Sequence, residues 1–353
     1  MHTSSVFAQL IINWYHVHGR KNLPWQIKKT PYTVWLSEIM LQQTQVKTVI
    51  PYFNIFIQKF PDFNSLQVAS MNEILHLWSG LGYYTRAKNL YKTIKIISDR
   101  YNNQLPNNFT DLIKLPGIGK STAGAILSLS FGYYYPILDG NIKRIITRYY
   151  AIHSAINKKK IEEKLWKIIN KITPLYNTGK FNQAMMDLGS LICTRISPKC
   201  HICPLSTNCL ALLKNSCEHY PKKNNNKKIL KKTFYFLILQ YNHFIFLKKR
   251  PSYGIWANLF SFPEFYKEIN LISWMQGKKI EKNETIIIDS FYHRVTHLKL
   301  HIVPICVNIT MLQKNNINHK YSVWYNLIKP QSIGLSSPVK KILKKLLIFI
   351  KNV

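Results

Sequence analysis

Acidic residues are scarce in this chain of 353 residues: 15 Asp and Glu stand against 49 Lys and Arg, a net charge of +34. Such a charge attracts a polyanion such as nucleic acid, because binding releases the counterions condensed on it. Lysine, asparagine and isoleucine are enriched throughout, however, as a biased genome composition would also produce. The charge therefore permits nucleic-acid binding without proving it.

Long apolar runs and disulfide patterns are also missing. The longest apolar stretch, residues 125–138, is interrupted by Gly132 and Pro136 and is too short to span a bilayer. No apolar core follows a basic N-terminal start, so we expect no signal peptide. Six cysteines, four of them bunched, fit a reducing compartment with a metal site better than a disulfide framework. Cys217 and Cys306 are left over, and we assign them no role.

Period-2 alternation is absent before residue 230, and helical periodicity dominates there. Helices are predicted over residues 32–45, 72–77, 85–97, 121–130 and 161–171. Residues 214–232 are rich in Lys and Asn and read as a polar linker. Beyond them, aromatic and β-branched runs predict strands over 234–239, 244–247, 286–288, 298–302 and 322–325, with a hairpin turn at 241–242 and a closing helix over 339–350. The pattern predicts an all-helical domain followed by a smaller α+β domain.

Two motifs in the first domain suggest ligands. Four cysteines with six, two and five residues between them could hold an iron–sulfur cluster or zinc, and the single Cys-x-x-Cys pair favours iron–sulfur; they are Cys193, Cys200, Cys203 and Cys209. The turn Leu115-Pro-Gly-Ile-Gly-Lys120 could bind a phosphate with the amides at a helix N-terminus, or simply connect two helices. Asp139 follows about twenty residues later and could also be a helix N-cap.

This turn and Asp139 resemble the helix-hairpin-helix DNA glycosylases, in which a Gly-rich hairpin binds DNA phosphate. Gly117, Gly119 and Lys120 would then contact the backbone, and the cysteines match the [4Fe-4S] loop of many members. The resemblance implies that one [4Fe-4S] cluster shapes a basic loop carrying Arg195 and Lys199.

Glu38 is the only acidic residue among the first sixty, and it lies among apolar neighbours. Burial would raise its pKa and keep it protonated near neutral pH, which suits an acid that protonates a purine at N7. A surface carboxylate paired with a lysine is the alternative. The segments WLSEIMLQQTQV (35–46), GLGYY (80–84) and LDGN (138–141) closely resemble the adenine DNA glycosylase (MutY) family.

That resemblance extends from about residue 14 to 209 and more loosely beyond. It implies that Glu38 is the general acid and that Asp139 stabilises the cationic sugar, in parallel with glycoside hydrolysis. Further residues are implied by position: Trp25, Ser121 and Asn141 in the adenine pocket, Gln43 and Tyr83 as wedges in the base stack, and Thr44 at the opposing base. Core packing is the alternative for Trp25 and Tyr83.

Ser121 occupies the position at which relatives that cleave pyrimidine lesions carry a Schiff-base lysine. Lys120 is displaced by one residue, which rotates it by about 100° on a helix, so it points away from the pocket. A pyrimidine-lesion glycosylase with lyase activity is therefore the weaker alternative. A catalytically inactive iron–sulfur DNA-binding protein is another, and the presence of both Glu38 and Asp139 argues against it.

The second domain resembles the MutT-like (Nudix-fold) module of the same family. A Nudix catalytic box needs clustered glutamates to hold magnesium, and none stands between Pro263 and Tyr292, so we expect no pyrophosphatase activity. The family reads 8-oxoguanine through a Phe-Ser-His segment. Here Val295 replaces the aromatic residue, while Thr296 keeps the hydroxyl and His297 is retained.

We therefore predict a helical glycosylase domain over residues 1–213, with its iron–sulfur loop at 193–209, a linker over 214–232 and a MutT-like recognition domain over 233–353. The predicted enzyme is a monofunctional DNA glycosylase that excises adenine paired with 8-oxoguanine or guanine. Its expected partner is double-stranded DNA carrying such a mispair. We expect a bacterial-type enzyme that is monomeric and acts on DNA at the nucleoid in the cytoplasm. We expect no association with a membrane.

Overall fold

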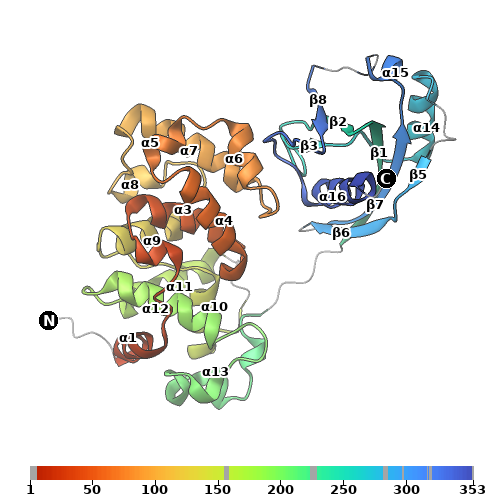
Figure 1. Cartoon of the computed structure of the whole chain (residues 1–353). Coiled ribbons are helices and arrows are strands. Elements are labelled where there is room, and N and C mark those ends of the chain that lie inside the picture. Colours follow the sequence, from red (N-terminus) through yellow and green to blue (C-terminus); the bar gives the residue numbers. More distant parts are fainter. Residues whose placement is uncertain are drawn as a thin grey trace. The chain divides into compact units, whose positions relative to one another are not determined.

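The computed structural model describes residues 6–154, 159–222, 229–280, 285–295, 298–315, 317 and 320–351. It divides into two compact units. The first contains Met1–Val68 and Asn89–Asn226, and the second contains Ala69–Lys88 and Lys227–Val353. Figure 1 shows helices through the N-terminal part of the chain and a sheet in the C-terminal part.

The first unit is helical throughout its described residues. Its elements are α1 (Val6–His18), α2 (Pro24–Ile27), α3 (Pro31–Leu41), α4 (Val46–Lys59), α5 (Phe63–Gln67), most of α7 (Thr85–Tyr101), α8 (Phe109–Leu112), α9 (Lys120–Ser130), α10 (Gly140–Tyr149), α11 (Lys159–Ile172), α12 (Thr178–Leu191) and α13 (Leu210–Leu213), with short 3-10 turns at Cys200–Ile202, Ser206–Asn208 and Cys217–His219.

Helix α3 is shorter than predicted. It begins at a capping box, in which the Thr30 hydroxyl accepts from the Thr33 N–H, with Pro31 in the first turn. The sequence predicted a helix over 32–45, but α3 ends at Leu41 because Gln43 adopts a left-handed backbone with φ 57°. The residues after Leu41 therefore form an exposed turn that leads into α4.

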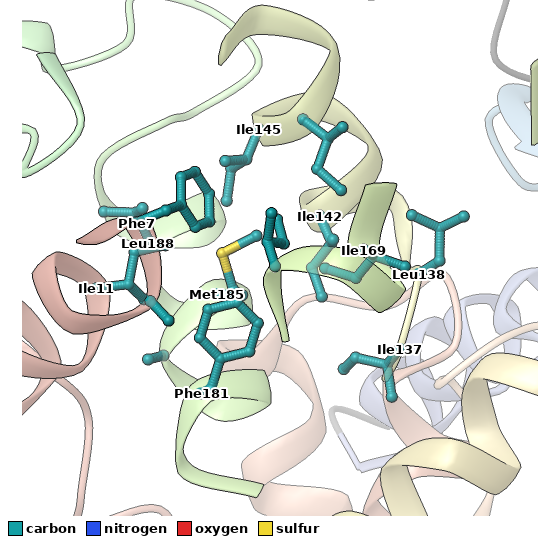
Figure 2. Close-up of a cluster of buried hydrophobic side chains, with 14 of the residues drawn as sticks. Phe7, Ile11, Ile137, Leu138, Ile142, Ile145, Ile169, Phe181, Met185 and Leu188 are labelled. Carbon is teal, nitrogen blue, oxygen red and sulfur yellow. The ribbon is translucent and has the colours of Figure 1, made fainter. Parts of the chain in front are cut away.

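The core of the first unit lies among α1, α10 and α12 (Figure 2). On α10, isoleucines at 142, 145 and 146 recur at helical spacing and are buried. They pack with residues of α1 and α12 and with the segment before α10: Phe7, Ile11, Ile137, Leu138, Phe181, Met185 and Leu188. This packing fixes the N-terminus of α10, where Asp139 lies.

The second unit is built on a mixed sheet, with strands β1 (Leu230–Tyr241), β2 (Phe244–Lys249), β3 (Phe260–Ser261), β4 (Glu264–Phe265), β5 (Thr285–Ile287), β6 (Phe291–Val295), β7 (Leu298–Asn308) and β8 (Ser322–Asn326). The main order is β3-β2-β1-β7-β5, and β1 and β7 run parallel from Leu230↔Leu298 to Gln240↔Asn308. The predicted hairpin at 241–242 is confirmed, because Tyr241 pairs with Phe244 and Asn242 has φ 52°.

Helices accompany the sheet in the second unit. They are α6 (Met71–Leu77), α14 (Glu268–Gly277), α15 (Met311–Asn315) and α16 (Ser337–Lys351), the last beginning two residues before the predicted closing helix. Leu271 and Met275 of α14 pack on Leu237 and Leu239 of β1. The predicted linker overlaps this unit, since β1 already begins at Leu230.

No helix within the described residues has the length and apolar character needed to cross a membrane.

Candidate active site

A cavity of about 260 Å³ opens in the first unit among α1, α2, α3 and α12. Trp25 forms an apolar wall and is held edge-on against Phe53, with ring centroids 5.2 Å apart. Trp25 is buried and lines this cavity; its predicted role as a wall of the adenine pocket stays a prediction. Polar lining comes from Gln26, Glu38 and Gln183, with Lys29 among the cations. The cavity thus combines an aromatic face with a few hydrogen-bonding groups, as small-ligand sites do.

Glu38 carries the only carboxyl among the described residues that line this cavity. Burial, with a smaller contribution from the charge of Asp139, raises the pKa of Glu38 to about 7. Helix α3 places Glu38 there because the neighbouring positions Trp35, Ile39 and Met40 are buried in the core. The side chain can therefore hold or release a proton near neutral pH, as predicted for an acid among apolar neighbours.

Asp139 is the N-cap of α10 and acts on Glu38 electrostatically. Its Oδ1 accepts from the Ile142 N–H at 2.8 Å, and its Oδ2 accepts from Asn141 Nδ2 at 3.0 Å. Burial raises the pKa of Asp139, while these hydrogen bonds and Arg144 oppose the shift. Asp139 is not among the described residues that line the cavity. The capping role considered from the sequence is confirmed, and it does not exclude a second role.

Ser121 and Asn141 surround Asp139 rather than the cavity. The Ser121 hydroxyl accepts from the Leu138 N–H at 3.1 Å. Asn141 donates to Asp139 and accepts from Arg144 Nη2 at 2.9 Å. Neither residue is among those described as lining this cavity, and their predicted place in the adenine pocket stays a prediction. They instead hold the segment on which Asp139 lies.

Sequence reasoning missed the two glutamines of the cavity. Gln183 Nε2 donates to Asp187 Oδ1 at 3.2 Å, and buried Asp187 in turn accepts from Arg20 Nη2 at 2.6 Å. These contacts fix the orientation of the Gln183 amide by engaging one of its two N–H donors. Gln26 Oε1 is buried and has no hydrogen-bond partner. No sequence motif marked either residue, because α2 and α12 meet only in the folded chain.

The Gly-rich turn forms as predicted at one of its two glycines. Gly117 has φ 82°, and a Cβ there would lie 3.0 Å from the Asn89 Cβ, so glycine is required. Gly119 has ordinary extended backbone and is the N-cap of α9, with open space where a side chain would stand. The amides at the start of α9 follow it directly and could bind an anion. Lys120 lies over the Trp166 ring at 3.9 Å and is not among the described cavity residues.

The predicted base-stack residues lie on two strained turns. Gln43 is exposed with φ 57°, and Gln42 beside it donates to the Gly117 carbonyl at 3.1 Å. Thr44 closes the same turn through its N–H to the Leu41 carbonyl. Tyr83, in the second unit, has φ 47° and is 42% exposed. Left-handed backbone at a bulky residue is costly and is concentrated at functional sites. Thr296 and His297 lie outside the described residues.

The thiols of Cys193, Cys200 and Cys209 lie near enough to Cys203 to act on it electrostatically. The pKa of Cys203 is raised to about 12 by burial and by the neighbouring thiols of Cys193, Cys209 and Cys200. Backbone N–H groups of Leu205 point at Cys203, and those of Leu212 and Ala211 at Cys209. Among the described residues, no three His, Cys, Asp or Glu side chains are grouped as ligands of one metal ion. Converging thiols with amide donors fit an anionic iron–sulfur cluster.

Helix α10 connects this cysteine loop to Asp139. Buried Arg148 donates to Cys193 Sγ at 3.3 Å and to the Thr194 carbonyl at 2.7 Å. Arg144 donates to the Cys193 carbonyl at 2.7 Å and also holds Asn141. Cys217, to which the sequence assigned no role, has its Sγ 3.9 Å from Cys200 Sγ. Cys306 is buried elsewhere, in the second unit.

Family models match both parts of the chain. Residues 36–171 match the HhH-GPD superfamily of base excision DNA repair proteins, and residues 234–345 match the NUDIX domain. The first match contains Glu38, Asp139 and the Gly-rich turn.

Individual relatives give a more specific comparison than the two family models. An adenine DNA glycosylase from Buchnera aphidicola subsp. Baizongia pistaciae is 53% identical over 345 residues, covering 98% of this chain and 97% of that protein. The human adenine DNA glycosylase is 36% identical over 216 residues, covering 59% of this chain and 39% of the human protein. Among solved structures, a thermostable thymine-DNA glycosylase is 27% identical with a TM-score of 0.54, covering 59% of this chain and 96% of that one.

Proposed function

The chain belongs to the adenine DNA glycosylase family, and from this premise we propose that it excises adenine paired with 8-oxoguanine or guanine after flipping the base out of the duplex. It is an adenine-specific DNA glycosylase of base excision repair, a hydrolase of the N-glycosidic bond. The observation that carries the proposed mechanism is the Glu38 carboxyl, which lines a cavity with a pKa of about 7 and is coupled to Asp139.

Protonation of the leaving base falls to Glu38. The neutral carboxyl donates its proton to N7 of the flipped adenine, the C1′–N9 bond breaks, and its electron pair stays on the base. The oxygen of a water molecule then bonds to C1′, and one water proton passes to the Glu38 carboxylate, which restores the acid. Pyrimidines lack N7, so this acid favours a purine.

Asp139 stabilises the positive charge that develops on the sugar. The charge of Asp139 contributes to raising the pKa of Glu38, and hydrogen bonds from Ile142 and Asn141, with Arg144, favour the ionised form of Asp139 against the burial that raises its own pKa. In the proposed mechanism the pair holds one proton, on Glu38, and one negative charge, on Asp139. Two carboxyl groups with different protonation states are what acid-assisted glycosidic cleavage requires.

Adenine is recognised by the two glutamines of the cavity. Asp187 takes the Nε2 donor of Gln183, which leaves its Oε1 as an acceptor, and Gln26 Oε1 is a second acceptor without a partner. The 6-amino group of adenine supplies N–H donors, whereas the 6-oxo group of guanine does not. Trp25 provides a face for stacking.

The Gly-rich turn at residues 115–120 and the basic loop with Arg195 and Lys199 bind the DNA backbone. The two strained turns that carry Gln43 and Tyr83 separate the stacked bases. The amides that follow Gly117 and Gly119, with Lys120, bind a phosphate. Gln43 and Tyr83 wedge into the base stack, and Thr44 lies at the opposing base; unstacking costs a few kcal/mol, which the bent complex offsets.

An iron–sulfur cluster belongs to the cysteine loop. Cys193, Cys200, Cys203 and Cys209 would hold one [4Fe-4S] group, which crosslinks the loop and positions exposed Arg195 and Lys199 toward the phosphate backbone. The loop's attachment to Arg144 and Arg148 of α10 supports this structural role.

The C-terminal module recognises the lesion rather than hydrolysing a nucleotide. Its segment 295–297 would contact 8-oxoguanine with Thr296 and His297, without the aromatic residue of the family pattern.

The lyase alternative is weakened by Lys120, which lies over Trp166 and outside the described cavity lining. Lys143 is paired with Glu162 at 2.6 Å and has no essential role.

A glycosylase assay tests the proposal. A duplex with adenine opposite 8-oxoguanine should yield free adenine and an alkali-labile site, while the same duplex with cytosine in place of adenine should stay intact. Release of thymine glycol from a lesion duplex, with no adenine release, would overturn it.

A further inference from the structure

The loop that carries Tyr83 is attached to the C-terminal part of the chain. In the second unit, buried Ser79 follows α6 and opens this loop, which we call the wedge loop (residues 79–84). The Ser79 hydroxyl accepts from the Leu335 N–H at 3.0 Å, and the Ser79 carbonyl accepts from Lys340 Nζ at 2.8 Å. The start of the wedge loop is thus bound by both ends of one short C-terminal segment.

The other end of the wedge loop binds the same peptide. The Tyr84 hydroxyl donates to the Leu335 carbonyl at 3.2 Å and accepts from the Gly80 N–H at 3.1 Å. Ser79 and Tyr84 therefore occupy both backbone groups of Leu335. Tyr84 is buried, so this hydroxyl contact lies away from competing water.

Leu335 is in turn anchored to the sheet. Strand β3 forms an isolated bridge at Phe260↔Leu335, and the Phe260 N–H donates to the Gly334 carbonyl at 2.8 Å. Packing is close on the other side as well, because a Cβ at Gly334 would lie 2.6 Å from the Leu75 Cβ. The contacts run without interruption from the sheet, through residues 334–335, to the wedge loop.

The wedge loop itself has a backbone that needs such support. Gly80, Gly82 and Tyr83 all have positive φ, at 108°, 77° and 47°. The Arg86 guanidinium holds the Gly82 carbonyl at 3.1 Å and lies 5.3 Å from the Tyr83 ring. A left-handed tyrosine persists only where surrounding contacts fix it.

We infer that the C-terminal domain positions the Tyr83 wedge, with Ser79, Tyr84 and Lys340 as the positioning residues. The inference rests on the proposed function, in which Tyr83 enters the base stack. It links the domain that recognises the lesion to the unstacking step. Binding of the C-terminal domain to the lesion strand and insertion of Tyr83 would occur together, because the wedge loop is rigidly attached to that domain.

The test is a double-mutant cycle in the full-length protein. Tyr84→Phe removes one hydroxyl and little volume, and Lys340→Met removes one donor. Each is measured alone and with Tyr83→Ala, by single-turnover adenine release from an adenine:8-oxoguanine duplex and by the fluorescence of 2-aminopurine beside the lesion, which reports unstacking. Matched controls are Tyr325→Phe, at a buried tyrosine of strand β8 in the same domain, and Lys344→Met, exposed on the same helix as Lys340. Melting temperatures confirm folding.

Tyr84→Phe and Lys340→Met should each slow release about 3- to 10-fold and reduce the fluorescence rise, with no further loss in the Tyr83→Ala background, because residues that act through one group are not additive. The controls should match the wild type. Equal losses with and without Tyr83, or a wild-type rate in both variants, would overturn the inference while leaving the wedge intact. A wild-type rate in Tyr83→Ala would remove the wedge from the proposed function, and the inference with it.

Discussion

Glu38 and Asp139 form a coupled pair of carboxyl groups across two helices. The charge of Asp139 adds to burial in raising the pKa of Glu38 to about 7, while Asp139 is held at the N-terminus of α10 by the Ile142 N–H and by Asn141. One proton shared unequally between them would give the enzyme an acid for the base and an anion for the sugar. These separate roles of Glu38 and Asp139, and the roles of the residues around them, can be tested by substitution.

Replacing Glu38 by glutamine should abolish adenine release while leaving DNA binding intact. The amide keeps the size of the side chain but has no proton to donate to N7, so the single-turnover rate should fall at least 100-fold, within the range of general acid catalysis. Glu163→Gln, on the exposed surface of α11, is the matched control and should keep the wild-type rate. A Glu38→Gln enzyme within tenfold of the wild type would refute the acid assignment.

The same substitution should stabilise the fold at alkaline pH. The Glu38 pKa rises from 4.5 when unfolded to about 7 when folded, so the folded chain binds more protons between these values and stability falls as the pH rises through that window. The loss amounts to about 3 kcal/mol, at about 1.4 kcal/mol per pKa unit. Thermal unfolding at pH 5 and pH 8 should show the wild type losing stability relative to Glu38→Gln. If the stability of the two proteins changed with pH in the same way, the Glu38 pKa would be the same in the folded and the unfolded chain.

Asp139→Asn should separate catalysis from capping. Asparagine is as good an N-cap as aspartate, because its amide oxygen still accepts from the Ile142 N–H, so the melting temperature should change little. Loss of the charge should slow adenine release about 100-fold or more and should lower the pKa of Glu38. Asp139→Ala loses the cap as well and should cost about 1 kcal/mol of stability. An Asp139→Asn enzyme with full activity would leave Asp139 as a cap alone.

Cys203→Ser should lose the iron–sulfur cluster, whereas Cys217→Ser should keep it. Cys203 lies near enough to the other three loop thiols to be affected by them electrostatically, while Cys217 lies beside Cys200 outside the predicted set of four ligands. Iron and acid-labile sulfide, with the visible absorption of the purified protein, measure the content directly. Cys306→Ser, in the second unit, is the further control. Zinc in place of iron in the wild type, or loss of the metal in Cys217→Ser, would contradict the ligand assignment.

Local patterns predicted what depends on neighbouring residues. The helical period located α6, α7, α9 and α11, alternation located the strands around β1 and β7, and the isolated acid at 38 is half-buried with a raised pKa. The end of α3 was missed because nothing in the sequence of residues 42–45 forbids a helix; the strain at Gln43 is imposed by the fold.

Groups brought together by tertiary packing could not be predicted in this way. Gln183 enters the cavity from α12, and its orientation is set by Asp187 and Arg20, which are distant in sequence from Glu38. Ser121 and Asn141 were predicted in the adenine pocket from their motif alone, and the motif did not show that their hydrogen bonds go to the Leu138 backbone and to Asp139. A sequence motif indicates which residues act together, whereas only the folded structure shows which of their side chains line the cavity.

The pH dependence of adenine release under single-turnover conditions tests the central claim most directly. With adenine opposite 8-oxoguanine, the rate should be greatest below pH 7 and should fall about tenfold per pH unit above it, as the Glu38 carboxyl loses its proton. Glu38→Gln should show a low rate without that fall. A wild-type rate that stays level from pH 6 to pH 9 would contradict the account, since the proton would then have to come from another group.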